Sequence, residues 1–591
     1  MFSKVLIANR GEIAIRVMRA CEELGIATVA VYSELDRDAL HVKRADEAYL
    51  LGPGPAAESY LNIDKLVEVI KESGAEAVHP GYGFLSENAA FVTRLEAEGI
   101  TFIGPPASAI DAMGSKTKAR ELMQAAGVPI VPGTTEPTET YEDALRIAKE
   151  EIGFPVAVKA AAGGGGKGFR VALEEKDLKD AFEGASREGE KFFSDGTVYL
   201  ERYLPRPRHV EVQIIADKHG NCIHLGERDC SIQRRHQKLI EEAPAPSWVV
   251  DEELRAKIGE IGINAAKAVD YVGAGTIEGM LQDGEYFFLE MNTRVQVEHC
   301  VTEMVTGIDI VKQGIKAAYG LPLDYTQDDV QLRGHAIECR INAESAPMNF
   351  APTPGAIGDY LEPSGPGVRV DSGVGAGGIV SPMYDPMVAK LIVWDVDREQ
   401  ATARMLRALS EYKIEGLTTL IPFHSKIMAT SNWAEASTCS ELLEDPEWLA
   451  STAPAEPVVP TDQDEDDNVE HDYLVEVNGR RVPVKLFAPP IAAGGGGAAV
   501  AAAPKKKREK RKSSGASGDD VLSPLQGNMW KVVVEAGQTV EEGQLLCIIE
   551  AMKMENEVKA HKAGTIKELA AKEGEPINSG DLIATIVSAA E

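Results

Sequence analysis

The 591-residue chain has few cysteines and no long apolar run. Its seven cysteines are scattered, form no CxxC pair and are odd in number, which argues against a disulfide framework and against a zinc site. There is no run of 18 apolar residues, and no basic and apolar leader that ends in small residues. The sequence therefore predicts neither a membrane span nor a secretory signal, and we expect a cytoplasmic protein without a membrane partner.

Positive charge is also scarce, because 61 Lys and Arg residues stand against 93 Asp and Glu residues, for a net charge of -32. Nucleic-acid binding requires a basic surface that neutralises phosphates, so we expect no nucleic-acid partner. If the substrates are small anions, the field of the whole protein repels them. A local cluster of Lys and Arg must outweigh that field within a Debye length of about 8 to 10 Å, which predicts a basic substrate site.

The chain is too long for one hydrophobic core, and its length predicts about three to five domains. Residues 1 to about 450 alternate strand-like and helical patterns. They begin with a strand at 5–8, a helix at 12–24 and a strand at 28–31, which is typical of a βαβ unit with a parallel sheet. Low-complexity sequence follows, with a short strand-like patch at 473–487, and we expect a flexible tether at about 488–520.

The C-terminal segment contains an internal repeat that predicts a duplicated β unit. Gly527, Gly537, Gly543, Leu545 and Ile549 recur at the same spacing as Gly564, Gly574, Gly580, Leu582 and Ile586. Each half is rich in Val, Ile and Leu and is interrupted by glycine at turn positions, as expected of short strands. Lys553 lies in the link between the halves. We expect this link to form an exposed hairpin tip that presents the lysine amine to a modifying enzyme.

Residues 290–298 carry the strongest polar pattern in the chain. As a strand, this segment would place five polar side chains on one face: Glu290, Asn292, Arg294, Gln296 and Glu298. A hairpin around residues 282–284 would precede it. We expect a three-residue loop with Gly284 in the left-handed region, because this loop puts Glu278 and Glu290 on one face, whereas a two-residue turn would separate them. Two carboxylates and an amide oxygen suit Mg²⁺ held against ATP phosphates.

A glycine run at 161–168 follows the strand-like segment 156–159. It does not fit a Walker A loop, because Lys167 precedes Gly168 rather than Ser or Thr. We interpret it as a mobile flap between strands, whose backbone N–H groups close over a triphosphate while Lys159 meets the charge. A loose turn without a ligand remains the alternative.

The segment Ala551-Met552-Lys553-Met554 resembles the attachment site of biotin carboxyl carrier domains. The resemblance implies that a biotin protein ligase joins biotin to Lys553 as an amide. Lipoyl carriers share the fold and are the alternative, although their lysine is usually not bracketed by two methionines. The opening of the segment, Ser523-Pro524-Leu525-Gln526-Gly527, departs from the usual Ala-Pro-Met-Pro-Gly.

Residues 1 to about 450 resemble biotin carboxylase, an ATP-grasp enzyme, in nearly every segment. The matching motifs are 4–12, 79–88, 113–116, the glycine run, 209–211, 226–231, 233–238 and 290–299. The resemblance implies an α/β fold with a Rossmann-like N-terminal domain at 1–115, an ATP-grasp domain at 116–330 and an α+β C-terminal domain at 331–450. A linker at 451–520 and an all-β biotinyl domain, a flattened sandwich, at 521–591 complete the expected layout.

The resemblance also implies a role for each matching residue. The ATP phosphates would be held by Lys116, Lys159, Gly163, Gly164, Gly165 and Gly166. The adenine pocket would be lined by Glu201, Arg202 and Leu204, and the ribose and phosphate side by His209, Gln233 and His236. Mg²⁺ or Mn²⁺ would be bound by Glu278, Glu290 and Asn292. The family often has Lys where this chain has Arg202, which changes the hydrogen-bond fork.

The implied reaction consumes ATP and bicarbonate. Bicarbonate would be bound by Lys238, Arg294, Gln296 and the backbone of Val297. Glu298 would take its proton, so that it attacks the γ-phosphate and forms carboxyphosphate, which yields CO₂ and phosphate. Phosphate would then remove the ureido proton of biotin, while Arg340 stabilises the resulting oxyanion.

In length and layout the chain resembles the short α subunits of actinobacterial acetyl-CoA or propionyl-CoA carboxylases of fatty acid biosynthesis. The remaining residues have no room for a carboxyltransferase domain, so the resemblance implies a hetero-oligomer with a separate β subunit. An α subunit of a pyruvate or 3-methylcrotonyl-CoA carboxylase is one alternative. A carrier and scaffold with an inactive ATP site is another, which the intact set Lys238, Arg294, Glu298 and Arg340 disfavours.

Overall fold

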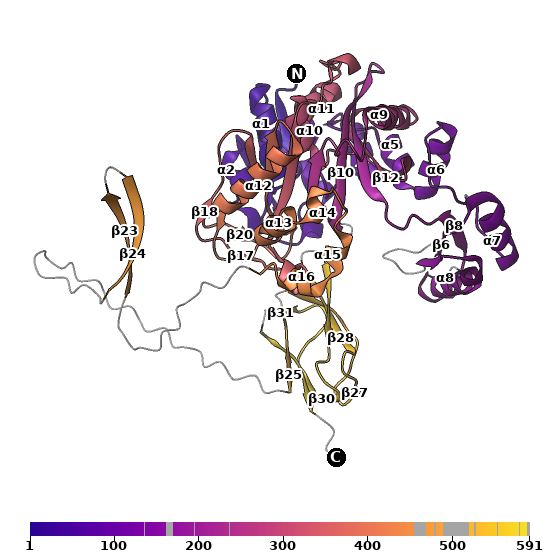
Figure 1. Ribbon diagram of the computed structural model, residues 1–591. Coiled ribbons are helices and arrows are strands. Elements are labelled where there is room, and N and C mark those ends of the chain that lie inside the picture. The colour runs from indigo at the N-terminus through magenta and orange to yellow at the C-terminus, as the bar shows by residue number, and fades with distance from the viewer. Residues whose placement is uncertain are drawn as a thin grey trace, which may run out of the picture. The chain divides into compact units, whose positions relative to one another are not determined.

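The computed structural model describes most of the chain (Figure 1). The described residues are 1–134, 136–160, 169–193, 196–235, 237–453, 469–477, 480–488, 519–524, 527–551, 554–577 and 580–587. They divide into two units, 1–453 together with 521–591, and 454–520. Among the described helices, none has the length and apolar character needed to cross a bilayer.

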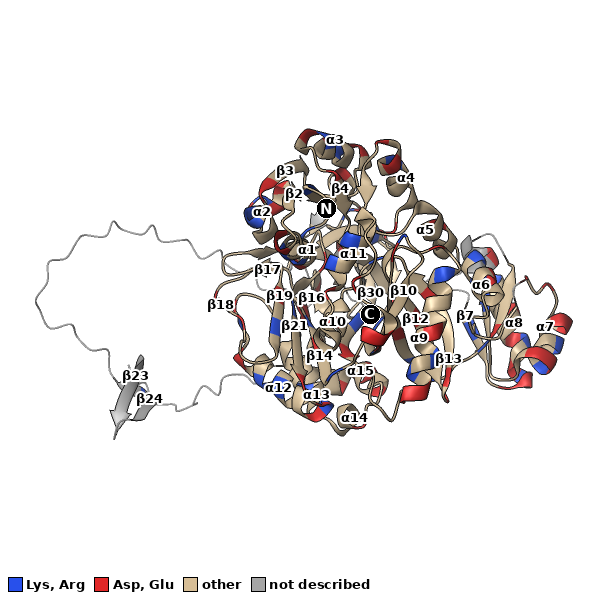
Figure 2. Ribbon diagram, turned by 90° about the horizontal axis from the view of Figure 1, so that it is seen from above, with Lys and Arg blue, Asp and Glu red and all other residues tan. Residues whose placement is uncertain are grey.

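The N-terminal part is a parallel five-stranded sheet in the order β3-β2-β1-β4-β5. Its strands are β1 (Lys4–Ile7), β2 (Ala27–Ser33), β3 (Glu47–Gly52), β4 (Ala77–His79) and β5 (Thr101–Phe102). The helices are α1 (Gly11–Glu23), α2 (Leu40–Arg44), α3 (Ile63–Ser73), α4 (Ala89–Ala97) and α5 (Ala107–Gly114). The predicted βαβ unit is confirmed. Figure 2 shows acidic and basic residues mixed on α3, as expected of a solvent-facing helix.

The site is built on an eight-stranded antiparallel sheet that runs through both the predicted ATP-grasp and C-terminal domains. Its order is β13-β12-β9-β10-β11-β14-β21-β19. The strands are β9 (Arg208–Ala216), β10 (Cys222–Arg234), β11 (Gln237–Ala243), β12 (Gly273–Gln282), β13 (Glu285–Asn292), β14 (His335–Asn342), β19 (Val368–Ser372) and β21 (Met387–Asp395). Because β11 pairs with β14, residues about a hundred positions apart in the sequence become neighbours.

Helices cover this large sheet. Those between its strands are α9 (Glu252–Lys267), α10 (His299–Thr306) and α11 (Ile310–Tyr319). Those that follow are α12 (Arg398–Glu411), α13 (Ile421–Met428), α14 (Ser431–Ala434), α15 (Ser440–Glu444) and α16 (Pro446–Ala450). Short strands complete this part: β15 (Glu344–Ser345), β16 (Ala351–Pro352), β17 (Gly355–Ala356), β18 (Tyr360–Leu361), β20 (Ile379–Val380) and β22 (Lys413–Ile414). The core under α12 is made of apolar residues of β14, β21 and these helices.

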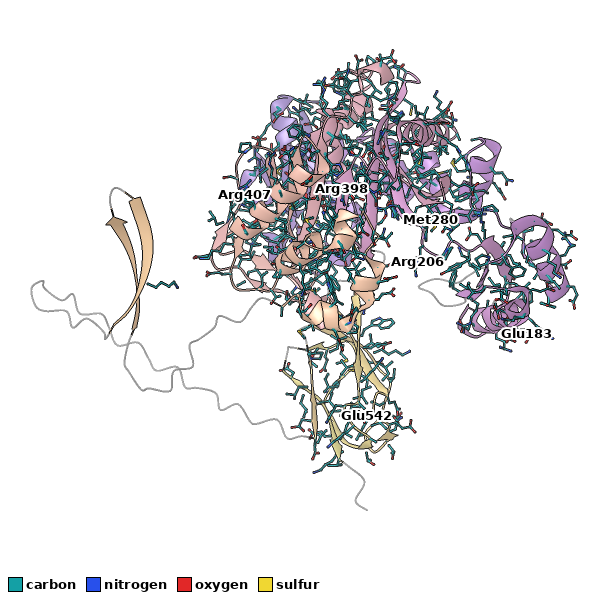
Figure 3. The ribbon with its side chains drawn as sticks, viewed as in Figure 1. Glu183, Arg206, Met280, Arg398, Arg407 and Glu542 are labelled. Atoms are coloured by element: carbon teal, nitrogen blue, oxygen red, sulfur yellow. The ribbon has the colours of Figure 1, made fainter. Side chains whose placement is uncertain are left out.

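A smaller sheet, in the order β7-β6-β8, carries the nucleotide-side residues. Its strands are β6 (Val156–Ala160), β7 (Phe169–Ala172) and β8 (Val198–Arg202), with α6 (Lys116–Ala125), α7 (Tyr141–Ile147) and α8 (Leu178–Phe193) nearby in the chain. Figure 3 marks Glu183 on α8 and Arg206 in the segment that leads back to β9. The predicted strand before the glycine run is confirmed as β6. The run itself lies outside the described residues.

The hairpin between β12 and β13 differs from the prediction. Its turn has two residues, Asp283 (φ 53°) and Gly284 (φ 78°), and Gln282 pairs with Glu285, so the predicted three-residue loop is wrong. A bulge between Glu278 and Gly279 shifts the register by one residue. Since a one-residue shift moves side chains to the other face, the bulge restores Glu278 and Glu290 as direct cross-strand partners.

The C-terminal domain is all β, as predicted. One sheet has the order β25-β32-β30-β27 and the other β29-β28-β26-β31. The strands are β25 (Asp520–Leu522), β26 (Gly527–Val532), β27 (Thr539–Val540), β28 (Leu545–Ala551), β29 (Met554–Lys559), β30 (Gly564–Leu569), β31 (Pro576–Ile577) and β32 (Leu582–Val587). The duplicated glycines Gly537, Gly543, Gly574 and Gly580 all have positive φ, which explains why glycine recurs there. Lys553 lies outside the described residues, between the paired strands β28 and β29.

The predicted strand-like patch at 473–487 lies within an antiparallel hairpin. This hairpin consists of β23 (Val469–Val477) and β24 (Arg480–Ala488), paired throughout their lengths. Residues 489–518 of the predicted tether lie outside the described residues.

Candidate active site

A buried lysine stands at the centre of the polar cluster. Lys238, on β11, is 8% exposed, and its Nζ contacts Glu211 on β9, Glu278 on β12 at 2.8 Å and Glu298 at 2.6 Å. Burial lowers the pKa of Lys238, but the charges of Glu211 and Glu298 outweigh burial and hold that pKa well above its ordinary value. The ammonium group is therefore permanently charged.

Arg228 supports one of these carboxylates from behind. Arg228 is fully buried on β10, and its Nε donates to Glu211 at 2.6 Å while Nη1 donates to Gln213 at 2.7 Å and to Thr302 at 3.0 Å. Burial raises the pKa of Glu211, yet Lys238 and Arg228 outweigh it, and the pKa lies below its ordinary value. Both residues belong to matching motifs, but neither was assigned a role from the sequence.

Glu298 lies at the end of the loop that joins β13 to α10. It is the N-cap residue of α10 and is fully buried. Its Oε1 accepts from Lys238 at 2.6 Å, and its Oε2 accepts from Nη2 of Arg340 at 3.0 Å. Burial raises the pKa of Glu298, but Lys238 and Arg340 outweigh it and keep the pKa below its ordinary value. The carboxylate is ionised and oriented at both oxygens, as a general base requires.

The polar residues after β13 converge in a different way from the predicted strand. The strand ends at Asn292, so the predicted strand through residue 298 is wrong beyond that point. Arg294 instead donates to Asn292 at 2.7 Å, to Gln296 at 3.0 Å and to Glu87 at 2.8 Å. Gln296 in turn donates to Glu278 at 2.8 Å. Hydrogen bonds across a loop, rather than strand alternation, bring the set together, and Glu87 is an anchor that was not assigned from the sequence.

The three residues predicted to bind metal offer oxygen ligands at one edge of the sheet. Glu278 and Glu290 are cross-strand partners, and Asn292 follows on β13. Asn292 Nδ2 is buried without a hydrogen-bond partner among the described residues. Nε2 of His209 lies 3.0 Å from Glu278 Oε2, and ligand atoms of His209, Glu211 and Glu278 lie within 4.8 Å of one another. Two carboxylates and an amide oxygen fit the ligand preference of Mg²⁺.

The small sheet supplies the nucleotide-side residues. Glu201 on β8 forms ion pairs with Lys159 on β6 and with Arg120, the latter at 2.9 Å. Leu204 packs with Val131 and Phe287 in a small apolar cluster. The guanidinium carbon of Arg202 lies 6.0 Å from the centre of the Phe287 ring. Gln233 donates a hydrogen bond to the carbonyl of Cys230. The structure does not describe the Lys116 side chain, Gly163–166 or His236.

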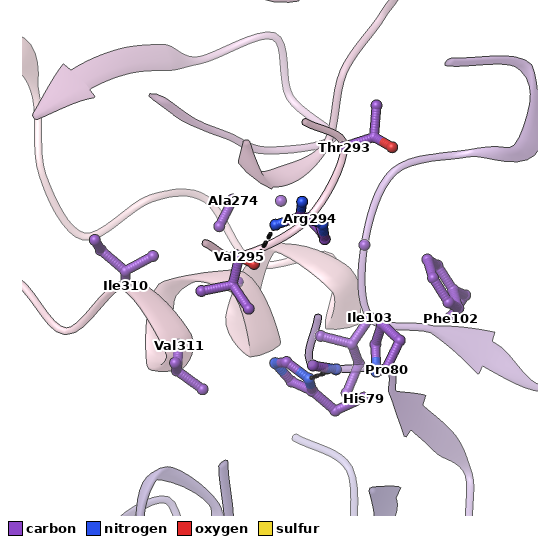
Figure 4. A pocket seen from close by; sticks show the side chains of 14 residues that line it. His79, Pro80, Phe102, Ile103, Ala274, Thr293, Arg294, Val295, Ile310 and Val311 are labelled. Carbon is purple, nitrogen blue, oxygen red and sulfur yellow. Dashed lines mark hydrogen bonds between the residues drawn. The ribbon is translucent and has the colours of Figure 1, made fainter. Parts of the chain in front are cut away.

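A small cavity lies beside the loop of Arg294 (Figure 4). It is lined by the ends of β4 and β5, including His79 and Phe102, and by Ala274 and Val295, and its volume is about 20 Å³. Arg294 donates a hydrogen bond to the carbonyl oxygen of Val295, with 3.5 Å between the two atoms. Figure 4 marks this hydrogen bond with a dashed line. This volume holds about one water molecule, so the cavity is not a substrate pocket.

Four family models match the chain. They are Biotin carboxylase, N-terminal domain, at residues 1–110; Carbamoyl-phosphate synthase L chain, ATP binding domain, at 115–326; Biotin carboxylase C-terminal domain at 338–445; and Biotin-requiring enzyme at 518–586. These matches agree with the predicted ATP-grasp carboxylase and biotinyl domains.

Known proteins resemble the chain over most or all of its length. The biotin-dependent acyl-coenzyme A carboxylase alpha3 subunit of Mycobacterium leprae is 46% identical over 603 aligned positions, covering 99% of this chain and 98% of the relative. A pyruvate carboxylase subunit of Methanothermobacter thermautotrophicus is 55% identical over 428 residues, covering 72% of this chain and 87% of the relative.

A solved structure shows the same fold. The biotin carboxylase domain of the Hydrogenobacter thermophilus 2-oxoglutarate carboxylase, in complex with MgADP, ADP and bicarbonate, matches with a TM-score of 0.68 and 49% identity. The match covers 76% of this chain and 99% of that chain. The predicted fold class is thereby confirmed. The chain belongs to the biotin carboxylase family, and it carries a biotin carrier domain in addition to the carboxylase.

Proposed function

We propose that this biotin carboxylase is the α subunit of an acyl-CoA carboxylase of the actinobacterial acetyl-CoA or propionyl-CoA type, which serves fatty acid biosynthesis in the cytoplasm. The observation that carries the chemistry is the contact of one buried Lys238 with Glu298, which is also bound by Arg340. The acyl-CoA class is supported by the relative from Mycobacterium leprae, which matches the carboxylase and the carrier alike.

Bicarbonate binds, in this proposal, where cations converge on Glu298. Lys238, Arg294, Gln296 and the backbone of Val297 hold the anion, and Glu298 accepts its proton. The deprotonated anion then attacks the γ-phosphate of ATP and forms carboxyphosphate and ADP. Glu298 suits this role because its pKa is low enough for it to be ionised before bicarbonate arrives.

The nucleotide lies between the small sheet and the large one. Lys116, Lys159 and the glycine run bind its phosphates, Glu201, Arg202 and Leu204 line the adenine pocket, and His209, Gln233 and His236 reach the ribose and phosphate side. Glu278, Glu290 and Asn292 hold Mg²⁺ or Mn²⁺. The metal ion supplies charge neutralisation at the phosphate oxygens when it is bound.

Arg340 acts at the second step. Its guanidinium donates to Glu298 at 3.0 Å, and the Arg340 side chain is 11% exposed. It places positive charge where the ureido oxygen of biotin becomes negative. Biotin, attached to Lys553 by a biotin protein ligase, supplies the nitrogen that accepts the carboxyl group.

We propose that a separate carboxyltransferase β subunit completes the reaction in a hetero-oligomer. The relative from Mycobacterium leprae, which is similar over its whole length, is named as an alpha subunit, and this supports a partner subunit for the present chain. The hairpin of β23 and β24 is our candidate for the docking element, because in the described part of the chain these strands pair only with each other, and a two-stranded hairpin alone is marginally stable in water. The alternative partner is the β subunit of a pyruvate or 3-methylcrotonyl-CoA carboxylase, since a pyruvate carboxylase subunit is similar to this chain as well.

The acceptor is tested by purifying the biotinylated chain with its partner and adding ATP, radiolabelled bicarbonate and a panel of acceptors. We expect label in acetyl-CoA or propionyl-CoA products. Label in pyruvate or 3-methylcrotonyl-CoA alone would establish the alternative.

The docking role is tested by deleting residues 469–488 and measuring co-purification with the β subunit. We expect the partner to be lost while carboxylation of free biotin remains. A deletion of equal length in 489–518 is the matched control, and retention of the partner by the hairpin deletion refutes the role.

A further inference from the structure

Two glutamates next to Arg340 have no role in the proposed reaction and are neighbours across two strands. Glu241 on β11 and Glu338 on β14 are direct partners in the antiparallel ladder, and both are fully buried. Side chains of such partners project to the same face with Cβ atoms about 4.5 to 5.5 Å apart. The fold thus places two carboxyl-bearing side chains on the same face of neighbouring strands, both fully buried.

The hydrogen bonds of this pair are incomplete among the described residues. Oε1 of Glu241 accepts from Nε of Arg340 at 2.5 Å. Oε2 of Glu241 and both oxygens of Glu338 are buried and have no partner. Leaving a buried polar atom without a partner is costly, so three such atoms on two facing residues require an explanation.

One proton shared by the pair reduces the deficit from three atoms to one. Two neighbouring carboxylates that are both fully buried repel each other and lack solvation, so one of them becomes a carboxylic acid. A carboxylic acid donates its O–H to the neighbouring carboxylate, which satisfies an oxygen on each residue. The negative charge belongs on Glu241, because Glu241 carries the contact with the Arg340 guanidinium. The proton therefore belongs on Glu338.

We propose that Glu338 holds a proton that it shares with Glu241, and that this singly charged pair is the positioning element that sets the orientation of Arg340. Arg340 is then fixed between two carboxylates, with Nε on Glu241 and Nη2 on Glu298. The proposal rests on the proposed function of Arg340 and Glu298 in carboxylation, and it concerns the residues that orient them.

The charged surroundings agree with one proton at this pair. Burial raises the pKa of Glu241 to about 7, with Arg340 opposing and Glu298 reinforcing the shift. Burial raises the pKa of Glu338 well above its ordinary value, against the charge of Lys390. The titratable and charged groups that interact electrostatically with the pair, from its own strands, the neighbouring strands and α10, are Arg340, Lys390, Lys238, Cys230, Glu298, Cys300 and Cys339.

Loss of the shared proton at alkaline pH adds a second buried negative charge beside Arg340. That charge competes with Glu298 for the guanidinium and weakens the orientation of Arg340. The wild-type enzyme should therefore lose activity on the alkaline side as the pair is deprotonated. Glutamine in place of Glu338 donates a hydrogen bond at every pH, so it should preserve the orientation where the wild-type pair loses it.

The kinetic test compares variants of the full-length chain by bicarbonate-dependent ADP release with free biotin, as a function of pH. We expect Glu338→Gln to have the same kcat as wild type at neutral pH. The decrease of kcat at alkaline pH should be absent in this variant or shifted to another pH. Glu338→Ala and Glu241→Gln should lower kcat by about 10²-fold without changing KM for ATP, because they misplace Arg340. Rescue by glutamine but not by alanine separates positioning from simple loss of packing.

Glu344→Gln is the matched control. Glu344 is also a buried carboxyl whose pKa burial raises, to about 7; its Oε1 accepts from Gln237 at 3.4 Å, its Oε2 has no partner among the described residues, and no second carboxyl faces it in the strand ladder. This variant should retain the wild-type alkaline fall. The same pH profile for wild type and Glu338→Gln would overturn the proposal.

Difference infrared spectroscopy tests the proton without using activity. Wild type minus Glu338→Gln should show the carbonyl band of a buried protonated carboxylic acid at neutral pH, and the band should vanish at alkaline pH. The absence of this band overturns the proposal even if the enzyme is active. If the wild type releases no ADP in response to bicarbonate, the proposed function fails, and the infrared result still decides whether the pair holds a proton.

Discussion

The carboxylase region and the carrier domain bury different kinds of side chain. Around Lys238 the large sheet encloses Arg228, Glu211 and Glu298, which are fully buried charges held by one another. The described core of the carrier is apolar, and no charged side chain is buried among the carrier residues that the structure describes. Buried charge is expensive unless it is paired, and fixed paired charges of this kind suit the site at which we propose that carboxylation occurs. The carrier needs only a stable platform for one lysine.

The largest effect should come from removing that lysine. We propose that Lys553 carries biotin, so in Lys553→Arg carboxylation of the chain's own carrier and of the proposed acyl-CoA acceptor should be lost completely. Carboxylation of free biotin should remain, because the carboxylase region is unchanged. Intact-mass analysis and both assays measure this. Lys559→Arg, at an exposed lysine of β29, is the control and should behave as wild type. Carboxylation of acyl-CoA by Lys553→Arg would contradict the assignment of Lys553 as the biotin attachment site.

The next largest effect should come from the base. In Glu298→Gln the bicarbonate-dependent cleavage of ATP should fall by about 10² to 10⁴-fold, because proton removal by a positioned base contributes that much. ATP binding, measured by calorimetry, should be retained. Glu242→Gln is the control, since Glu242 is a buried carboxylate bound by Arg398 at 2.7 Å, away from Lys238. Equal turnover in Glu298→Gln and wild type would exclude Glu298 as the base.

A core substitution should separate the two regions. Ile549 is fully buried in the carrier core, and Ile549→Ala should destabilise the carrier by about 2 to 5 kcal/mol through lost contacts and a cavity. Hydrogen-exchange mass spectrometry should show faster exchange in residues 527–587 and unchanged exchange in residues 1–453. Val533→Ala, at a position 40% exposed, should change little. Faster exchange throughout the chain would show that the two regions are coupled.

The smallest effect concerns pH and a buried histidine of the carboxylase region. Burial lowers the pKa of His424 to about 4, against a hydrogen bond with the carbonyl of Arg340. The unfolded chain therefore binds a proton that the folded chain does not, and the stability contributed by His424 is lost as pH falls from about 6.5 toward 4. The stability advantage of wild type over His424→Gln should shrink by about 1.4 kcal/mol per pH unit in that window.

Hydrogen exchange in residues 398–428 at successive pH values measures this advantage. Ile427→Ala, at a fully buried residue of the same helix, is the comparison, because it removes no titrating group and its stability cost should not depend on pH in this way. A constant difference between wild type and His424→Gln would contradict the buried, neutral state of this histidine.

The same contrast explains what the sequence could predict. The carrier was predictable because its glycines recur where the repeated turns need positive φ. The first βαβ unit was predictable because its apolar runs are local. The joint placement of Glu278 and Glu290 was also correct, but for the wrong reason, since a bulge and not the loop length sets their register. Alternation alone cannot reveal a bulge.

The supporting residues of the active site could not be found in this way. Glu241 and Glu338 look like ordinary members of two strands, and Arg340 is 99 residues from Glu241 in the sequence. Their proximity depends on the pairing of β11 with β14, which no local pattern encodes. Glu87 and Arg228 were similarly missed because their partners lie in other parts of the chain. The residues that we propose to contact substrate lie in sequence motifs, whereas the residues that orient them are brought together only by the fold.

The central claim is that one chain carboxylates biotin at Lys238, Glu298 and Arg340 and receives the carboxyl group on its own Lys553. A single turnover of the fully biotinylated chain with ATP and radiolabelled bicarbonate tests it most directly. The account predicts label on the peptide that contains Lys553, in proportion to the ADP released and dependent on ATP. ADP release without any label on that peptide, or no bicarbonate-dependent ADP at all, would contradict it.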